Sequence, residues 1–263
     1  LLIFFTYDLG MVAVMSDQYY YVMKSYKASL QYDGTARSGW QFQEGIPTIQ
    51  GDLNFSLQKI LQGDFTTRAA SRTDKGVHAF AQVVKISVEE ESQLDMTKLN
   101  AALPSHIRCL DLSPCAREFI PSVDQTSKEY RYLFTNSFEK YIAEAPSPLN
   151  IDDIQKCVAM IKGTNDFKNF WSIGGVSNTT VREILECDLT QINPQDFFRN
   201  TLFTTDTTRC WQFRIHGTGF LKHMVRHLVG AGVNAAAIHG NKSQAQRTRA
   251  LDGFRQGATP VLV

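Results

Sequence analysis

The amino-acid sequence predicts an α+β fold made of two similar halves. Segments in which polar and apolar residues alternate, as in half-buried strands, are interspersed with segments whose apolar residues recur at helical spacing. The order strand, helix, strand, strand, helix, strand occurs twice along the chain, and it is the order of a ferredoxin-like unit. At 263 residues, 43% of them hydrophobic, the chain is long enough to bury two small cores. We therefore expect two ferredoxin-like halves whose antiparallel sheets abut, with a groove between them.

The first half is expected over residues 25–125, after an N-terminal extension over residues 1–24. Residues 27–32 alternate and end at the Asp33-Gly34 turn, which predicts a strand. Thr48 is suited to cap a helix with one apolar face, formed by Ile49, Leu53, Leu57, Ile60 and Leu61. The remaining expected elements are an extended segment over 65–70, a strand over 79–88, a helix from Asp95 to Leu103 and a strand over 107–112.

The second half is expected over residues 126–263 and repeats this order. A strand is predicted by the alternation of Tyr130, Tyr132 and Phe134. A helix that stops at Gly163 is lined by Ile154, Cys157, Val158 and Ile161. The remaining expected elements are strands over 184–190 and 211–215, a helix over about 220–238, a polar helix from Ser243 and a last strand over 260–263.

The charge of the chain is unevenly distributed, although the net charge is only +1. Residues 207–251 contain no Asp or Glu. The same stretch contains seven basic residues: Arg209, Arg214, Lys222, Arg226, Lys242, Arg247 and Arg249. A stretch whose charged residues are all positive is typical of a surface that binds a polyanion. The alternative is a solvated face whose acidic partners lie elsewhere in the sequence.

Three further patterns in the sequence concern the cellular compartment, metal binding and membrane association. Five scattered cysteines without a C-x-x-C pair favour a reducing, intracellular compartment, without distinguishing cytoplasm, nucleus and organelle. His223 and His227 have the spacing of a zinc motif, but the glutamate of H-E-x-x-H is missing, so we expect no metal. The apolar run over residues 1–15 is interrupted by Asp8 and is too short to span a bilayer, so we expect no membrane association.

The segment S-R-T-D-K-G-V-H (71–78) has an unusual arrangement of charges just before a strand. It places the carboxylate of Asp74 between Arg72 and Lys75. Taken alone, the pattern fits a carboxylate that caps the NH groups of a turn. A carboxylate that takes part in covalent chemistry must instead stay ionised, which inside a cleft requires a nearby cation.

Residues 71–84 (SRTDKGVHAFAQVV) resemble the signature loop of the tRNA pseudouridine synthase A family. Four further segments resemble the family in the same order: YDGTARSGWQFQ (32–43), KEYRYLFTN (128–136), the turn GTNDFKNF (163–170) and GFLKHMVRHLVGAG (219–232). The resemblance extends from about residue 27 to residue 263. Ser71 and Lys75 stand where bacterial members have glycine and alanine, which places the sequence nearer to the eukaryotic branch of the family.

The resemblance implies a tRNA pseudouridine synthase with two ferredoxin-like halves around a central basic RNA-binding cleft. Such an enzyme breaks the C1′–N1 bond of a uridine, turns the bound uracil and rejoins it through C5. No redox change or phosphate transfer is involved, so we expect no cofactor. The expected partner is tRNA or another structured RNA, and the expected state is a monomer or a homodimer. The rival interpretation is a non-catalytic RNA-binding or RNA-folding protein that uses the same cleft.

The resemblance also assigns three catalytic residues. Asp74 is the carboxylate that assists at C1′ or its neighbour, and Arg226 pairs with it. Tyr130 stacks on the flipped uracil and serves in the C5 proton step. Tyr132 shares the same face of the strand, and only the resemblance selects Tyr130. From residue types alone, Arg226 also fits an exposed arginine and Tyr130 a core residue.

Further contacts with the substrate follow from the same resemblance. Arg72 fills the space vacated by the flipped uridine and holds a phosphate. Lys75 contacts a phosphate or is simply exposed. Val261 and Leu262 belong to an apolar tail strand that walls the uracil pocket. His78 is expected to be a hydrogen-bonded structural residue.

Overall fold

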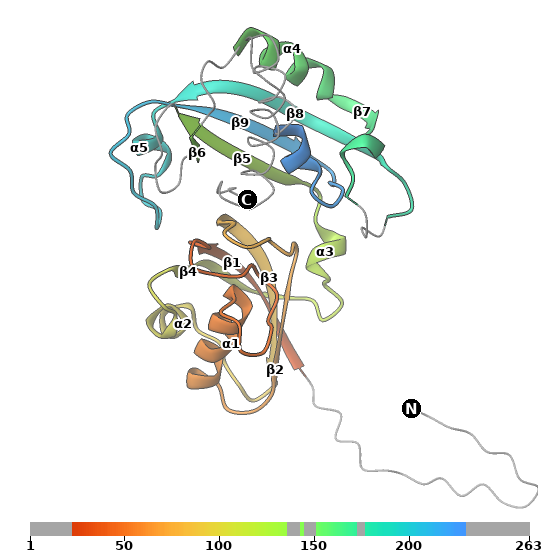
Figure 1. Cartoon of the computed structure of the whole chain (residues 1–263). Coiled ribbons are helices and arrows are strands. Elements are labelled where there is room, and N and C mark those ends of the chain that lie inside the picture. Colours follow the sequence, from red (N-terminus) through yellow and green to blue (C-terminus); the bar gives the residue numbers. More distant parts are fainter. Residues whose placement is uncertain (1–22, 136–142, 145–150, 173–176, 230–263) are drawn as a thin grey trace, which may run out of the picture.

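The computed structural model describes residues 23–135, 143–144, 151–172 and 177–229. Within these ranges the chain is α+β and forms two sheets, as the sequence predicts. Figure 1 shows the two halves one above the other, with α1 and α2 beside the lower sheet and α4 over the upper sheet. The helix expected from Ser243 and the strand expected over 260–263 lie outside the described residues.

The N-terminal half has the order β-α-β-β-α-β. Its elements are β1 (Met23–Tyr32), α1 (Ile49–Ile60), β2 (Phe65–Ala69), β3 (Ala79–Glu89), α2 (Met96–Ala102) and β4 (Ile107–Cys115). The strands are arranged β2-β3-β1-β4, and each neighbouring pair is antiparallel. On the central strand β1, Ala28 lies opposite Val84 of β3 and Leu112 of β4. The alternating runs of the sequence therefore form one continuous sheet.

Helices α1 and α2 begin where their capping residues predict. The Thr48 hydroxyl accepts a hydrogen bond from the Gly51 N–H, and the Asp95 carboxylate accepts one from the Lys98 N–H. The apolar face of α1 packs with α2 and with β1 and β3 in one core, which includes Ile49, Leu53, Leu57, Leu99, Leu30 and Ile86. Both helices therefore cover the same face of the sheet.

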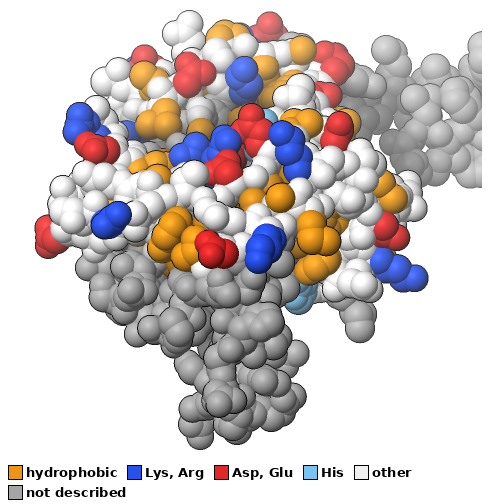
Figure 2. Space-filling model, turned by 90° about the horizontal axis from the view of Figure 1, so that it is seen from above, with side chains coloured by type: hydrophobic (Ala, Val, Ile, Leu, Met, Phe, Trp, Pro, Cys, Tyr) orange, Lys and Arg blue, Asp and Glu red, His pale blue; other side chains and the backbone are white. Residues whose placement is uncertain are grey.

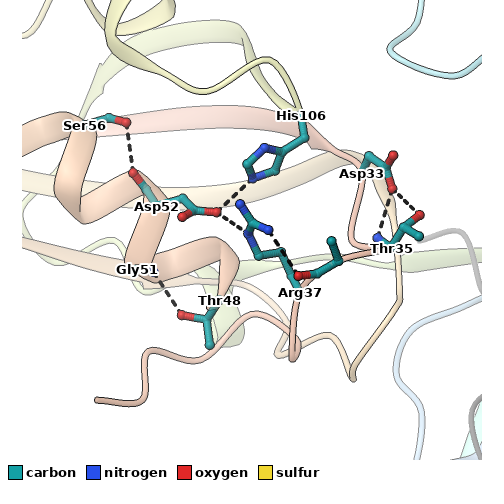
Figure 3. Close-up of polar contacts among 9 residues, drawn as sticks. Asp33, Thr35, Arg37, Thr48, Gly51, Asp52, Ser56 and His106 are labelled. Carbon is teal, nitrogen blue, oxygen red and sulfur yellow. Dashed lines mark hydrogen bonds and ion pairs between the residues drawn. The ribbon is translucent and has the colours of Figure 1, made fainter. Parts of the chain in front are cut away.

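A polar cluster joins α1 to the loop after β1 and to the start of β4. Asp52 of α1 accepts a hydrogen bond from the Arg37 guanidinium, and its Oδ2 lies 2.8 Å from His106 Nε2 (Figure 3). The backbone carbonyl of Arg37 in turn accepts a hydrogen bond from the Gly76 N–H at 3.2 Å. The cluster therefore supports the loop over residues 71–78.

We expect Asp52→Ala to lower the free energy of unfolding by about 2 kcal/mol, because two charge-assisted hydrogen bonds are removed. The partners Arg37 and His106 are only 21% and 22% exposed, so water replaces the carboxylate incompletely. Urea denaturation followed by circular dichroism measures the change. The control is Asp64→Ala, an exposed acid before β2, for which we expect a change below about 0.5 kcal/mol. Equal destabilisation of the two variants would contradict the supporting role of the cluster.

The C-terminal half contains a five-stranded sheet and is joined to the first half by a short helix, α3 (Pro121–Asp124). Its elements are β5 (Lys128–Thr135), β6 (Ala143–Glu144), α4 (Ile151–Ile161), β7 (Gly163–Asp166), the 3-10 helix η1 (Lys168–Phe170), β8 (Val181–Ile192), α5 (Pro194–Phe197) and β9 (Cys210–Gly217). The strand order is β6-β5-β9-β8-β7, in which β5 and β6 are parallel and the other pairs antiparallel. Tyr132, Phe213 and Ile154 pack together in its core.

The structure differs from the sequence-based expectation at four places in this half, one of which is the unexpected short helix α5 between β8 and β9. Strand β6 has only two residues, too few to produce a detectable alternation. The first four residues of the expected turn at 163–170 form β7, because Gly163, with a φ of 95°, turns the chain after α4 and lays it along the edge of β8. The helix expected from about residue 220 begins at Met224, because Lys222 and His223 form a turn in which His223 has a φ of 60°.

The two halves contact each other through aromatic side chains, and their sheets remain separate. Phe80, at the start of β3, lies 5.0 Å from the rings of both Phe197 and Phe203, measured between ring centroids. The Leu202 N–H donates a hydrogen bond to the buried Gln31 side chain at 2.8 Å. These contacts bring the loop over residues 71–78 next to the C-terminal half. None of the helices in the described ranges is long and apolar enough to cross a membrane.

Candidate active site

The loop over residues 71–78, which we call the Asp74 loop, is held by contacts of its buried residue Thr73. The Thr73 hydroxyl lies 2.9 Å from the hydroxyl of Tyr32, and its carbonyl accepts a hydrogen bond from the Trp40 N–H at 3.0 Å. Burial raises the pKa of Tyr32, so this phenol stays protonated. Because Thr73 points inward, Arg72 and Asp74 on either side of it are exposed. The loop therefore presents Asp74 to solvent from a fixed backbone.

Two glycines let the loop after β1 approach the backbone of the Asp74 loop. A Cβ at Gly39, which has a φ of 99°, would lie 2.6 Å from the Thr73 carbonyl oxygen. A Cβ at Gly34 would lie 2.1 Å from the Val77 carbonyl oxygen. Both distances are shorter than the closest contact allowed between a carbon and an oxygen atom. Any side chain at these positions would therefore push the two loops apart. These glycines therefore help to determine where Asp74 lies.

Arg226 lies on the helical segment 224–229 and forms an ion pair with Asp74. Its Nη2 donates a hydrogen bond to Asp74 Oδ2 at 2.9 Å. The two side chains are 25% and 49% exposed, respectively. The pair joins the two halves, and its carboxylate is accessible to a ligand from solvent.

His223 is the second residue of this segment that contacts Asp74. Its Nε2 lies 3.4 Å from Asp74 Oδ2, and its Nδ1 lies 3.0 Å from the Ser172 hydroxyl, which also lies 2.8 Å from His227 Nε2. Burial lowers the pKa of His223, as do the nearby positive charges of Arg226 and Lys222, while Asp74 acts in the opposite direction. The imidazole is therefore neutral at pH 7, and Arg226 supplies the positive charge next to Asp74.

Tyr130, on β5, is near enough to the ion pair for the charge of Asp74 to act on its phenol. Its ring packs against the C-terminal core and meets Phe220 edge to face, with centroids 4.9 Å apart. Burial raises the pKa of Tyr130, a hydrogen bond with the Ser71 side chain lowers it, and the charge of Asp74 raises it. The phenol is therefore protonated at neutral pH and close to the Asp74 loop. Tyr132, in contrast, is only 4% exposed and belongs to the core.

The other residues that the sequence analysis selected differ in their exposure and position. Arg72 and Lys75 are exposed on the Asp74 loop. His78 is buried, and its Nδ1 accepts a hydrogen bond from the Gly34 N–H at 3.2 Å. Val261 and Leu262 lie outside the described residues.

Arg214, one of the seven basic residues of the stretch 207–251, is surrounded by acids. Its guanidinium forms ion pairs with three carboxylates, those of Glu129, Glu186 and Asp188. The alternative of acidic partners elsewhere in the sequence therefore holds for Arg214, and its charge is not available to a polyanion. The uninterrupted basic stretch of the sequence is not an uninterrupted basic surface.

A cavity of about 420 Å³ lies between the halves beside the Asp74 loop. Its lining includes Ser71 of the loop, Gln82 of β3, Phe197 of α5 and Lys128 of β5. Burial lowers the pKa of Lys128. Lys128 comes two residues before Tyr130 on the same strand, so both side chains project from the same face. Asp74, Tyr130 and Arg226 do not themselves line the cavity, which adjoins the Asp74 loop through Ser71.

Comparison with known proteins identifies the family. The family model described as tRNA pseudouridine synthase matches residues 158–260. tRNA pseudouridine synthase A 2 of Desulfotalea psychrophila is 33% identical over 228 residues, which cover 80% of this chain and 83% of that relative. tRNA pseudouridine synthase A of Thermodesulfovibrio yellowstonii is 34% identical over 218 residues, which cover 79% and 83% of the two chains. The chain belongs to the tRNA pseudouridine synthase A family.

Membership of the tRNA pseudouridine synthase A family confirms the resemblance drawn from the sequence motifs. The segment matched by the family model contains Arg226 and ends before Val261. The identity to the two relatives extends over about four-fifths of this chain, so it is not confined to that segment.

Sequence reasoning missed the residues that hold this site together. Lys128 could have been found, because it shares a strand face with Tyr130 by the period of two. Gly39, Thr73 and the Ser172–His223 contact give no such signal, since their partners are distant in the sequence.

Proposed function

We propose that the protein converts uridines of tRNA to pseudouridine. One observation carries this proposal: an exposed carboxylate, Asp74, is paired with Arg226 from the other half of the chain and lies beside the phenol of Tyr130. The names of the relatives, which are tRNA pseudouridine synthases A, support the substrate class.

Asp74 assists cleavage of the C1′–N1 bond at C1′ or its neighbour. A negative charge is required for this role, and Arg226 stabilises it through a charge-assisted hydrogen bond. Within the described part of the chain, Arg226 and His223 both contact Oδ2, so Oδ1 is the atom that faces the substrate. The exposure of the carboxylate, 49%, lets a flipped nucleotide reach it.

Tyr130 holds the freed uracil and takes part in removal of the C5 proton. An uncharged phenol suits the first task, because its ring can stack on the base and its hydroxyl can hydrogen-bond to it. For the second task the hydroxyl is placed by Ser71 near the Asp74 loop.

We expect Tyr130→Phe to bind tRNA within about threefold of the wild type but to reduce turnover by roughly 10²–10⁴-fold, the usual size of a general acid–base contribution. Stacking and packing against Phe220 remain in this variant, and only the hydroxyl is removed. Single-turnover kinetics and filter binding separate the two quantities. Tyr132→Phe is the matched control on the same strand. An equal loss of binding and turnover in Tyr130→Phe would favour simple stacking.

Substrate contacts outside the reacting groups are assigned to four residues. Arg72 occupies the space left by the flipped uridine, and its position two residues before Asp74 on the exposed side of the loop supports this role. Lys75 contacts a phosphate. Val261 and Leu262 wall the uracil pocket.

We further propose that both halves are ferredoxin-like and that the junction between them is the RNA-binding cleft. The strand orders β2-β3-β1-β4 and β5-β9-β8 support the first statement. The cavity beside the Asp74 loop, with Lys128 in its lining, supports the second. Arg131 also lines the cavity, but its guanidinium is paired with Glu129.

The test uses tRNA transcripts labelled with tritium at uridine C5. Pseudouridine formation exchanges the C5 proton, so the wild-type protein is expected to release tritium to water without added cofactor. The pseudouridine content of the product is measured separately by nuclease digestion and chromatography. Binding of every tested tRNA without release from any of them would overturn the proposal and favour the non-catalytic RNA-binding alternative.

A further inference from the structure

Three cations form a row across the N-terminal sheet, one on each of three neighbouring strands. Arg68 of β2 lies directly opposite Lys85 of β3, and Lys85 lies directly opposite Lys27 of β1. We call these residues the basic row. Neighbouring strands are about 4.8 Å apart, so the row is roughly 10 Å long.

The basic row projects from the face that α1 and α2 do not cover. Lys27 precedes Ala28, and Lys85 lies between Val84 and Ile86, which are all buried in the core under the two helices. Successive side chains of a strand point to opposite faces, so both lysines point away from that core. Arg68 is their register partner and is exposed, like Lys27.

No acid lies in the adjoining rows on β1, β2 and β3. One adjoining row consists of Thr66, Ser87 and Ser25, and the other includes Val83 and Ser29. The nearest acid in register is Asp111 of β4, which lies opposite Ser29. Lys85 Nζ contacts the carbonyl of Arg117, a further cation on the segment that joins the halves. Ser25 and Ser87 of the adjoining row are buried and hydrogen-bonded to each other, whereas Arg68 and Lys27 at the two ends of the basic row are exposed, so these two charges are accessible.

The arrangement is unfavourable for the folded protein alone. Like charges directly opposite one another on a sheet repel. Arg214, by contrast, is neutralised by the three carboxylates around it. Figure 2 shows the molecule from above, where Lys and Arg side chains are interspersed with Asp and Glu. Among the residues that the structure describes, no carboxylate forms an ion pair with Arg68, Lys85 or Lys27, which is the charge pattern of a surface for a polyanion.

We infer that Arg68, Lys85 and Lys27 bind backbone phosphates of the substrate RNA at a distance from the reaction centre. The inference rests on the proposed function, which supplies a polyanionic substrate. Strand β3 runs from the Asp74 loop, and Lys85 is six residues beyond Ala79, so the basic row lies roughly 20 Å along the strand. The basic row therefore binds the folded body of the RNA and does not contact the flipped uridine.

The test compares two double variants that remove the same charge. Lys27→Gln with Arg68→Gln disrupts the basic row, and Lys59→Gln with Lys98→Gln removes two exposed cations from α1 and α2, which cover the other face. Lys85 is kept, because it is half-buried and contacts the connecting segment. Binding of full-length tRNA is measured from 50 to 300 mM salt, together with the melting temperature and kcat at saturating tRNA.

For the row variant we expect a dissociation constant about tenfold higher and a slope of log K against log salt smaller by about 2, close to one for each phosphate that is no longer neutralised. Its kcat is expected to be unchanged, and its melting temperature unchanged or slightly higher, because repulsion is relieved. The helix variant is expected to keep the wild-type slope. Equal slopes in all three proteins, equal changes in both variants, or a lower melting temperature in the row variant would overturn the inference.

A failure of the inference about the basic row can be distinguished from a failure of the proposed function. Tritium release by the wild type tests that function independently of the variants. If the wild type releases tritium and the row variant binds tRNA like the wild type, only the inference about the basic row fails.

Discussion

Replacement of Asp74 by alanine is expected to abolish tritium release from uridine C5, with turnover reduced by at least about 10⁴-fold. The proposed reaction involves no cofactor, so removal of the group proposed to assist at C1′ is expected to leave only binding and orientation. Binding of tRNA is expected to stay within about threefold of the wild type, because Arg72, Lys75 and the other cations remain.

The folded state is expected to tolerate this substitution. Asp74 is 49% exposed, and an ion pair of this exposure contributes about 1 kcal/mol or less to stability. The Arg226 left behind is itself accessible to water. A loss of activity therefore reports on the reaction and not on unfolding.

Asp74→Asn is the matched variant, since it keeps the shape of the side chain and removes only the charge. We expect it to be as inactive as Asp74→Ala in freshly prepared protein. Asp111→Asn, an exposed acid on β4, serves as the control and is expected to retain activity. Turnover by Asp74→Ala within tenfold of the wild type would remove Asp74 from the catalytic role.

The second-largest effect is expected for Arg226→Met, with turnover reduced by about 10²–10³-fold, the usual effect of removing one donor that stabilises charge at a reaction centre. The hydrogen bond from Nη2 to Asp74 Oδ2 is absent in this variant, while methionine keeps much of the apolar packing of the arginine stem. The stability decrease is expected to be only about 1 kcal/mol, because the pair is half-exposed. Single-turnover rates and urea denaturation measure the two effects.

The pH dependence of this variant provides a further check. The charge of Arg226 lowers the pKa of His223, so its removal raises that pKa. A protonated His223, with Nε2 3.4 Å from Asp74, then partly replaces the missing cation. The residual rate of Arg226→Met is therefore expected to rise relative to the wild-type rate as the pH falls from 8 to 6.

Arg199→Met is the control, because Arg199 is an exposed arginine of the same half that pairs only with the neighbouring Asp196 within the described residues. It is expected to behave like the wild type in both measurements. Near-normal turnover in Arg226→Met at pH 8 would show that Asp74 does not depend on Arg226.

Local features of the sequence predicted most of the secondary structure. The Thr48 and Asp95 side chains mark the starts of α1 and α2, and the alternating runs mark β1, β3, β5 and β9. These signals are reliable because capping and periodicity involve residues only a few positions apart. The expectation was wrong where the same local sequence is compatible with two structures. The segment from Gly163 was expected to be a turn, but it pairs with β8 as a strand. The helix expected from about residue 220 begins only at Met224, because the chain turns at His223.

The sequence predicted which residues belong to the candidate site, but not how their side chains lie relative to one another. The motifs named Asp74, Tyr130 and Arg226, and could not separate Tyr130 from Tyr132 without the family resemblance. The structure separates the two tyrosines by burial, since Tyr132 lies in the core and Tyr130 reaches the Asp74 loop.

The sequence by itself therefore determined the α+β class, the elements with strong periodicity and the family. Tertiary structure decided the ion pair between residues 152 positions apart, the close approach of Gly39 to Thr73 and the alignment of Arg68, Lys85 and Lys27 across three strands. The physical reason is that helix caps and strand alternation depend on neighbouring residues. Contacts across sheets and between halves depend instead on strand register and on the packing of whole elements, which no single segment specifies.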